Sequence, residues 1–402
     1  MKKYHNSLML FIAFFIIFEG VVIYYADFLK RPYWGDESHF VETIHSFGEE
    51  ISIQRIKNYK EVTPPFVYIV YALWGRIFGW EIYKLRILSV IIAFLVYFLF
   101  HQLLFMIFND LKTSLLTTLF LMVNPYMVGT SVFVFTDMLT IFFLLGCCFA
   151  IIRHNSILFL ISSSCALLCR QYSIFLIGAA GLYYLNKFLI EKKHSELYMM
   201  ISSVVSILPL LSLFFLWGGI APAYGLQYWN PENKFYYHPD YLTVYICMIF
   251  VYLFPFIILK WKYFYNNLKV LIGCFVAGGY YLLFPIAPSK VTLEQTDFVT
   301  VGLIHRFIKL FIKNHWVEHT IFFVFFCLVL PVIYFLVKDC YTKWKNKELH
   351  FPLFLDLSIL SFLIIMPFSY QNWEKYLLPL IPLLSIRILL IKDSDGKLPE
   401  ER

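Results

Sequence analysis

Long apolar runs recur from one end of the chain to the other, and they limit the fold more than any other feature of the sequence. A helix needs about 20 mainly apolar residues to cross the hydrocarbon core of a bilayer. Hydrophobic residues make up 60% of the chain and charged residues 15%, whereas soluble domains carry about 25% charged residues. The sequence therefore predicts an all-α polytopic membrane protein.

The apolar runs predict about 11–13 transmembrane helices. The first run has no cleavage site of small residues, so we expect it to stay in place as an anchor. We expect a single membrane domain over residues 1–402, in which 29–83 is the first extracytoplasmic loop and 84–402 holds the remaining helix bundle. The predicted spans are 8–28, 84–108, 112–125, 128–152, 155–169, 172–190, 197–219, 242–260, 267–287, 318–337, 351–370 and 376–392.

The distribution of basic residues predicts the orientation in the membrane. Lys and Arg are concentrated in short loops that contain Arg153, Lys192–Lys193, Lys260, Lys262 and Lys338–Lys347. The positive-inside rule places these loops and both termini in the cytoplasm. The loops 29–83, 220–241 and 288–317, and the turns near 125, 170 and 371–375, then face outward across an inner (plasma) membrane. Topology and anionic lipid headgroups account for the net charge of +7, so we expect membrane lipids and no nucleic acid as partners.

The first outward loop is expected to contain its own short helices. The stretch 41–56 is amphipathic, which is typical of helices that lie along a membrane interface. Pro64 and Pro65 predict the start of a further helix, because proline is tolerated in a first turn. Its continuation, 66–80, is rich in Tyr and Trp and is placed on or partly in the outer leaflet.

Polar residues gather in four places on this predicted outer side. Asp36 and Glu37 follow the first run, and Asp137 is predicted about two turns inside an apolar run, where an isolated carboxylate costs on the order of 3 kcal/mol. Arg170 is flanked by apolar runs, and a polar turn precedes the last span. Carboxylates and cations together suit a reaction on a phosphate-linked donor, since a base takes a proton from the attacking hydroxyl and Arg or Lys stabilises the departing phosphate. The four segments are Asp36–His39, Phe135–Asp137, Arg170–Gln171 and Gln371–Tyr376.

The order of these motifs resembles the GT-C superfamily of polyprenyl-phosphate-sugar-dependent glycosyltransferases. The first 150 residues are similar to bacterial aminoarabinose transferases and protein O-mannosyltransferases. Later segments are similar to the eukaryotic glucosyltransferase that adds the last glucose to the dolichol-linked oligosaccharide. The early motifs are Asp36–Glu37, Pro64–Tyr68, Ile77–Gly79, Leu85–Ser89 and Thr136–Phe143, and the later ones are Leu168–Ile174, Leu216–Ile220 and Trp373–Pro379.

The resemblance implies a GT-C-type bundle and an activity. The enzyme would transfer a hexose or pentose, with inversion and without a cofactor or metal, from a polyprenyl-phosphate carrier to a hydroxyl of a lipid-linked glycan, lipopolysaccharide or other cell-envelope acceptor. Its active site would face the extracytoplasmic side. The implied catalytic residues are Asp36, Glu37 and Asp137, and the implied donor-binding residues are Arg170, Gln171, Lys375, Tyr376, Arg86, Pro65 and His39.

Structural explanations compete for several of these residues. Thr63 stands where aminoarabinose transferases have a lysine before Pro-Pro, and Lys375 stands where a late arginine is expected. Phosphate recognition is therefore left open between Arg170, Lys375 and Arg86. Asp137 and Arg170 are also explained as a buried ion pair, and Arg86 is also explained as a side chain that snorkels to the interface.

Three other classes of protein are compatible with parts of the sequence. A secondary transporter or a lipid-linked glycan flippase would line a pathway with Asp137 and Arg170. A glycan polymerase would concentrate catalytic residues in a large late loop, whereas 288–317 is of modest size. The run His315–His319 matches the H-x-x-E-H pattern of zinc peptidases, but no further ligand cluster accompanies it.

Overall fold

The computed structural model describes residues 2–229, 236–296 and 299–391. These residues form helices joined by short loops, and no strand occurs among them. The chain divides into two compact units, Met1–Ile174 with Tyr198–Glu232 and Phe175–Leu197 with Asn233–Arg402. The expectation of a single membrane domain stays a prediction.

Seven described helical segments are long and apolar enough to cross a membrane, and a bent helix pair makes an eighth. This finding confirms the all-α polytopic class. Five shorter apolar helices are also present, and four of them fall within remaining predicted spans, so the total of 11–13 stays a prediction. The seven segments are Leu8–Tyr25, Ile82–Phe108, Gln171–Glu191, His194–Trp217, Pro239–Leu259, His315–Asn346 and Phe351–Phe368, and the shorter helices are Phe66–Phe78, Asp137–Ile152, Ser156–Cys169, Leu268–Leu283 and Leu380–Leu389.

The predicted spans 112–125 and 128–152 are wrong in their boundaries. Helix α6 (Leu111–Met122) and helix α7 (Pro125–Val132) meet at a bend of 75°. Asn124 causes the bend, because its side chain accepts hydrogen bonds from Tyr126 N and Met127 N and so starts a new helix. Helix α8 (Asp137–Ile152) begins only after a second break. Asp137 is therefore the first residue of a helix and does not lie two turns inside one.

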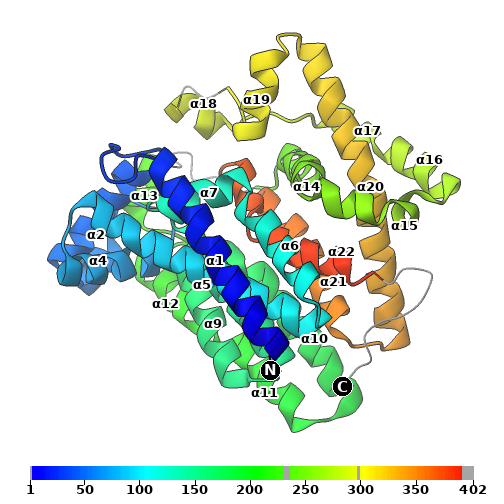
Figure 1. Cartoon of the computed structure of the whole chain (residues 1–402), viewed down its shortest axis with the longest axis horizontal. Helices are drawn as coiled ribbons and strands as arrows, with labels where there is room; N and C mark the ends of the chain where they lie inside the picture. The colour runs from blue at the N-terminus through cyan, green and yellow to red at the C-terminus, as the bar shows by residue number, and fades with distance from the viewer. Residues whose placement is uncertain (1, 230–235, 297–298, 392–402) are drawn as a thin grey trace. The chain divides into compact units, whose positions relative to one another are not determined.

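Segment 29–83, which the sequence predicts to be the first outward loop, contains short helices as expected. They are α2 (Glu37–Glu49), α3 (Ile53–Lys57) and α4 (Phe66–Phe78), and α4 begins directly after Pro65. Helices α2 and α4 pack side by side (Figure 1). The Trp80 ring lies against both, since a Cβ added at Gly48 or Gly75 would come within 2.0 Å or 2.5 Å of it. A larger residue at either glycine would displace the Trp80 ring from this contact.

The rest of the first unit packs around α5 (Ile82–Phe108), which contacts α6, α7 and α8. Helix α9 (Ser156–Cys169) pairs closely with α8, and Gly146 lies against the Ser162 hydroxyl at their contact. The unit also contains α1 (Lys2–Tyr25), α12 (Leu208–Trp217), α13 (Ala223–Trp229) and part of α11 (His194–Val205). These contacts fix the ends of α5, α8 and α9 that carry Arg86, Asp137 and Arg170.

The second unit is built on α14 (Pro239–Leu259), α20 (His315–Asn346), α21 (Phe351–Ile365) and α22 (Leu380–Leu389), which pack against one another. Figure 1 shows α20 as its longest helix. Buried charges join three of these helices, because Arg387 pairs with Asp356 at 2.6 Å and with Asp339. The unit also contains α10 (Ile174–Glu191) from Phe175 on, α15 (Trp261–Tyr265), α16 (Leu268–Ala277), α17 (Gly279–Leu283), α18 (Lys290–Thr296) and α19 (Leu303–Phe311).

Candidate active site

Glu37 and Arg86 form a buried ion pair at the start of α2. Both side chains have zero exposure, and two guanidinium nitrogens of Arg86 contact the two carboxylate oxygens of Glu37 at 3.0 Å and 2.7 Å. The Glu37 carboxylate also accepts hydrogen bonds from Trp34 N at 2.8 Å and Val134 N at 2.9 Å. Each of its oxygens thus has two donors. A carboxylate held in this way has no accessible lone pair with which to accept a proton from a substrate.

The other donors of Arg86 hold the segment that follows α1. They contact the carbonyl oxygens of Phe28 at 2.8 Å, Arg31 at 2.9 Å and Pro32 at 3.1 Å. Arg86 therefore does not snorkel to the interface, and its guanidinium is fully used within the unit. The pair fixes the first loop to α5 and, through Val134, to the extended segment before α8.

Asp36 lies beside this pair but is half-exposed. Its side chain is 41% exposed, and its carboxylate makes no cap hydrogen bond with the first turn of α2. His39 Nε2 lies 3.8 Å from Asp36 Oδ1, and His39 Nδ1 lies 2.8 Å from Glu61 Oε1. The imidazole therefore joins an exposed carboxylate to a buried one. Of the two neighbouring acids, only Asp36 is open to solvent.

The two carboxylates determine the charge of His39. Burial lowers the pKa of His39, but its hydrogen bonds with Asp36 and Glu61 and their negative charges outweigh burial and raise the pKa to about 9. The imidazole is thus protonated at neutral pH and lies between two anions. Thr43 Oγ1 donates a further bond to Glu61 at 3.4 Å. This arrangement holds the Asp36 side chain next to a fixed positive charge.

Asp137 and Arg170 meet at the end of α8 that faces α9. Asp137 is fully buried, and Arg170, 7% exposed, places a guanidinium nitrogen 3.4 Å from Asp137 Oδ1 and 2.5 Å from Thr136 Oγ1. The second oxygen, Asp137 Oδ2, has no hydrogen-bond partner among the described residues. The sequence correctly places the two residues together. The free oxygen distinguishes this pair from the saturated pair of Glu37 and Arg86.

Aromatic packing connects the segment before Asp137 to the segment of Asp36. The Phe135 ring lies 6.0 Å from the Phe40 ring on α2 and 6.2 Å from the Trp34 ring, measured between centroids. Trp34 also packs on Phe133 at 4.9 Å. The acidic residues of the first loop and of α8 therefore belong to one packed region of the first unit.

Two further expected donor-binding residues have structural contacts in the same unit. The Gln171 amide donates to the carbonyl oxygens of Val62 at 2.7 Å and Ile220 at 3.3 Å, and so joins two loops. Pro65 is buried and sets the start of α4, where Ile69 N bonds to the Pro65 carbonyl. Neither contact excludes a ligand, but both account for the residue without one.

The late polar turn belongs to the second unit, where it organises the loop before α20. The buried Glu374 carboxylate accepts hydrogen bonds from Tyr252 Oη at 3.1 Å, Ile304 N at 2.9 Å and His305 N at 2.8 Å. It therefore caps the start of α19, which the sequence did not indicate. Lys375 is partly exposed beside it, and the Tyr376 hydroxyl donates to Gln371 Oε1 at 3.4 Å.

The zinc-like pattern at the start of α20 is not assembled as a ligand set. Glu318 contacts His305 Nε2 at 2.5 Å, and His319 Nδ1 contacts the Tyr281 hydroxyl at 2.9 Å. Burial lowers the pKa of His305 in spite of Glu318. No group of three or more His, Cys, Asp or Glu with a metal-binding arrangement occurs in the described part of the chain.

Sequence reasoning missed Glu61, whose carboxylate contacts the candidate residue His39. Glu61 stands four residues before Pro65, and its proximity to the Pro-Pro motif was the available signal. Its contact with His39 spans 22 positions, which local patterns do not reveal. Thr136 directly precedes Asp137, but its bond to Arg170 again joins two separate helices.

Comparison with known proteins identifies the fold. No family model matches the chain, and no curated protein matches it. Among solved structures, it is similar to ArnT from Cupriavidus metallidurans bound to undecaprenyl phosphate, with a TM-score of 0.52 and 14% identity over 95% of this chain and 59% of the ArnT chain. The apo structure of the same ArnT gives a TM-score of 0.45 and 13% identity over 96% of this chain and 78% of the other.

The likeness to the first of these structures shows that the described helices have an ArnT-like arrangement. The chain spans 59% of the length of that ArnT chain. At 14% identity the similarity extends to the arrangement of helices and not to the reaction or its substrates.

Proposed function

We propose that this protein is a membrane glycosyltransferase that uses a polyprenyl-phosphate-linked sugar. It would transfer a hexose or pentose, with inversion, to a hydroxyl of a lipid-linked glycan, lipopolysaccharide or another cell-envelope acceptor. The observation that carries the proposal is the contrast between two neighbouring acids. Glu37 is saturated and buried by Arg86, whereas Asp36 is 41% exposed and held by His39. This contrast supports Asp36 as an accessible base on a rigid loop.

Asp36 accepts the proton of the acceptor hydroxyl as its oxygen attacks the anomeric carbon. The new bond joins the acceptor oxygen to that carbon, and the bond between the carbon and the donor phosphate breaks. The polyprenyl phosphate departs with the electron pair and its negative charge. A cation near the leaving group stabilises that charge, and no covalent enzyme intermediate is needed.

Arg170 is our candidate for the leaving phosphate. Arg170 is 7% exposed, and the Asp137 carboxylate lies 3.4 Å from its guanidinium, which is long for an ion pair with direct hydrogen bonds. A planar guanidinium suits the bidentate recognition of a phosphate. Asp137 would orient Arg170, with its free Oδ2 available to an acceptor or donor hydroxyl. Lys375 in the second unit is the alternative phosphate ligand.

Glu37, Arg86 and His39 are assigned positioning roles. The buried pair sets the path of the loop that carries Asp36, and His39 lies 3.8 Å from the Asp36 carboxylate and would orient it. Gln171 and Pro65 would shape the site through the backbone contacts they make. The site would face the extracytoplasmic side of the inner membrane, as the distribution of basic residues indicates.

The test is sugar transfer by purified protein in lipid nanodiscs supplied with radiolabelled polyprenyl-phosphate sugars and a membrane-lipid acceptor extract. Asp36→Asn should lower the rate by about 100-fold or more, since it keeps the shape but cannot take the proton. Glu49→Gln is the matched control, because this acid lies on the same helix with a side chain 75% exposed. Wild-type turnover in Asp36→Asn would remove the base assignment.

A secondary transporter is the second candidate, on a different observation. The buried Asp137 keeps one oxygen without a partner among the described residues, as an ion-coupling carboxylate does. Proteoliposomes distinguish the two functions. Solute uptake that depends on Asp137, with no transfer of label to an acceptor, would favour transport.

A further inference from the structure

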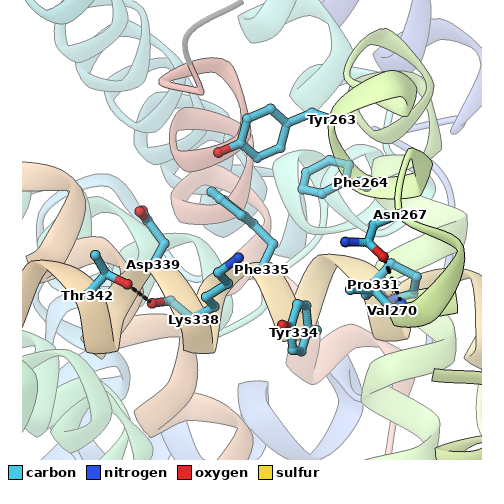
Figure 2. Close-up of a pocket in the computed structure, with 10 residues that line it drawn as sticks. All are labelled: Tyr263, Phe264, Asn267, Val270, Pro331, Tyr334, Phe335, Lys338, Asp339 and Thr342. Carbon is cyan, nitrogen blue, oxygen red and sulfur yellow. Dashed lines mark hydrogen bonds between the residues drawn. The ribbon is translucent and has the colours of Figure 1, made fainter. Parts of the chain in front are cut away.

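A pocket in the second unit lies between α15, α16 and α20, and none of the residues assigned to sugar transfer lines it. Its volume is about 380 Å³, within the range of about 300–1,000 Å³ that small-molecule sites occupy. Figure 2 shows aromatic rings around it and polar groups at its edge. The lining residues used here are Tyr263, Asn267, Tyr334, Lys338 and Asp339.

The pocket offers donors for which the described chain provides no acceptor. The Lys338 ammonium has no ion pair or hydrogen bond with any described residue. Asn267 uses its carbonyl oxygen to cap α16 at Lys269 N and Val270 N, which leaves its amide nitrogen as a donor. Figure 2 shows the Lys338 and Asn267 nitrogens turned toward the middle of the pocket. The hydroxyls of Tyr263 and Tyr334 add two further groups that bond to no described residue.

The one acid in the lining does not compete for these donors. Asp339 pairs with Lys343 and with the buried Arg387, so its charge is compensated by other residues. A site with a free cation and several donors, and with its acid neutralised, suits a ligand that only accepts hydrogen bonds and carries negative charge. A phosphate group has this chemistry.

The depth of the pocket in the membrane identifies the source of the phosphate. No Asp, Glu, Lys or Arg occurs in α20 between Glu318 and Lys338. This interval of 20 residues rises by about 30 Å, which matches the hydrocarbon thickness of a bilayer. Lys338 therefore lies at the level of the lipid headgroups, at the end of α20 that the positive-inside rule places in the cytoplasm.

Exposed apolar side chains continue from the pocket along the same helices. Leu268 and Ile272 on α16 are 71% and 57% exposed, and Val337 on α20 is 49% exposed. These side chains suit contact with acyl chains, next to a polar group at headgroup depth. We infer that the pocket binds the phosphate of an anionic phospholipid from the cytoplasmic leaflet, separately from any sugar donor.

Native mass spectrometry of the detergent-purified protein tests this inference with phosphatidylglycerol and phosphatidylcholine as probes. The wild type should bind phosphatidylglycerol more tightly than phosphatidylcholine. Lys338→Gln should weaken that binding about fivefold, because a basic residue near an anionic surface contributes about 1 kcal/mol. Lys345→Gln, at the same end of α20 but outside the pocket lining, is the matched control and should bind as the wild type does.

A second variant keeps the test valid if Lys338→Gln is unstable. Asn267→Asp preserves the oxygen that caps α16 but replaces the amide donor by a carboxylate, so it should weaken phosphatidylglycerol binding and leave thermal stability unchanged. Equal binding of the two lipids by the wild type, or wild-type binding by either pocket variant, would overturn the proposal. Displacement of phosphatidylglycerol by millimolar inorganic phosphate would also overturn it, since the site would then select free phosphate.

Discussion

Glu37→Gln is the substitution whose effect follows most directly from the contacts. Glu37 accepts two hydrogen bonds from Arg86 and two from backbone N–H groups. A glutamine amide has one acceptor oxygen. Its NH2 group would take the place of the other carboxylate oxygen and would face the two donors that bond to that oxygen in the wild type. The Arg86 charge would also remain buried without its counter-ion, at zero exposure.

Breaking a buried ion pair by removing one partner costs about 3–5 kcal/mol. Arg86 keeps its bonds to three carbonyl oxygens, so we expect the lower end of this range, about 3 kcal/mol. The assay is unfolding of the detergent-solubilised protein by heat and by denaturant, followed by circular dichroism. Glu49→Gln, which removes an exposed carboxylate from the same helix, should leave the transition unchanged.

The two possible roles of Glu37 give opposite results. A structural Glu37 predicts a large loss of stability, with transfer activity lost in proportion to the folded fraction. Wild-type stability in Glu37→Gln, together with a loss of transfer of 100-fold or more, would refute the structural assignment. Glu37 would then return to the catalytic residues.

Three further predictions concern the donor site, the pH dependence and the orientation. Arg170→Ala should weaken binding of the polyprenyl-phosphate donor in a titration, and Arg170→Lys should restore only part of it because lysine lacks the planar fork; unchanged affinity with a large loss of stability would make Arg170 a structural residue. The pKa of His39 is raised to about 9 in the folded protein. The protonated imidazole therefore stabilises the fold fully below the ordinary histidine pKa near 6.5, and this stabilisation is lost as pH rises through about 9. The protection of the α2 amides, measured relative to their intrinsic exchange rate at each pH, should therefore fall at alkaline pH, and His39→Gln should remove that fall. In a variant without native cysteines, Cys at position 49 should react with an impermeant thiol reagent from the extracytoplasmic side, and labelling only from the cytoplasm would contradict the predicted orientation.

The sequence predicts the membrane class because apolar runs of sufficient length have few other structures available. It also predicts the helices of the first loop, since the amphipathic stretch and Pro64–Pro65 carry local signals. It fails at the break before α8. There, Val134 N bonds to Glu37, 97 positions away, and no pattern within 128–152 reports this bond.

The candidate site shows the same division between local and distant information. Motif order brings Asp36, Asp137 and Arg170 forward as candidates, and the fold places Asp137 and Arg170 in contact. The roles of Glu37 and Arg86 depend on a contact across 49 positions, so the resemblance alone implies that both are site residues. Burial distinguishes Glu37, whose carboxylate is saturated with hydrogen bonds, from the exposed Asp36. Burial depends on how the helices pack, and local sequence patterns do not report it.

Sugar transfer by wild type and Asp36→Asn in the same nanodisc preparation tests the central proposal most directly. The experiment supplies one radiolabelled polyprenyl-phosphate sugar at a time and measures both the labelled acceptor and the released polyprenyl phosphate. The proposal predicts coupled formation of the two products by the wild type, and a rate at least about 100-fold lower in Asp36→Asn at unchanged thermal stability. Equal rates in the two proteins would contradict it.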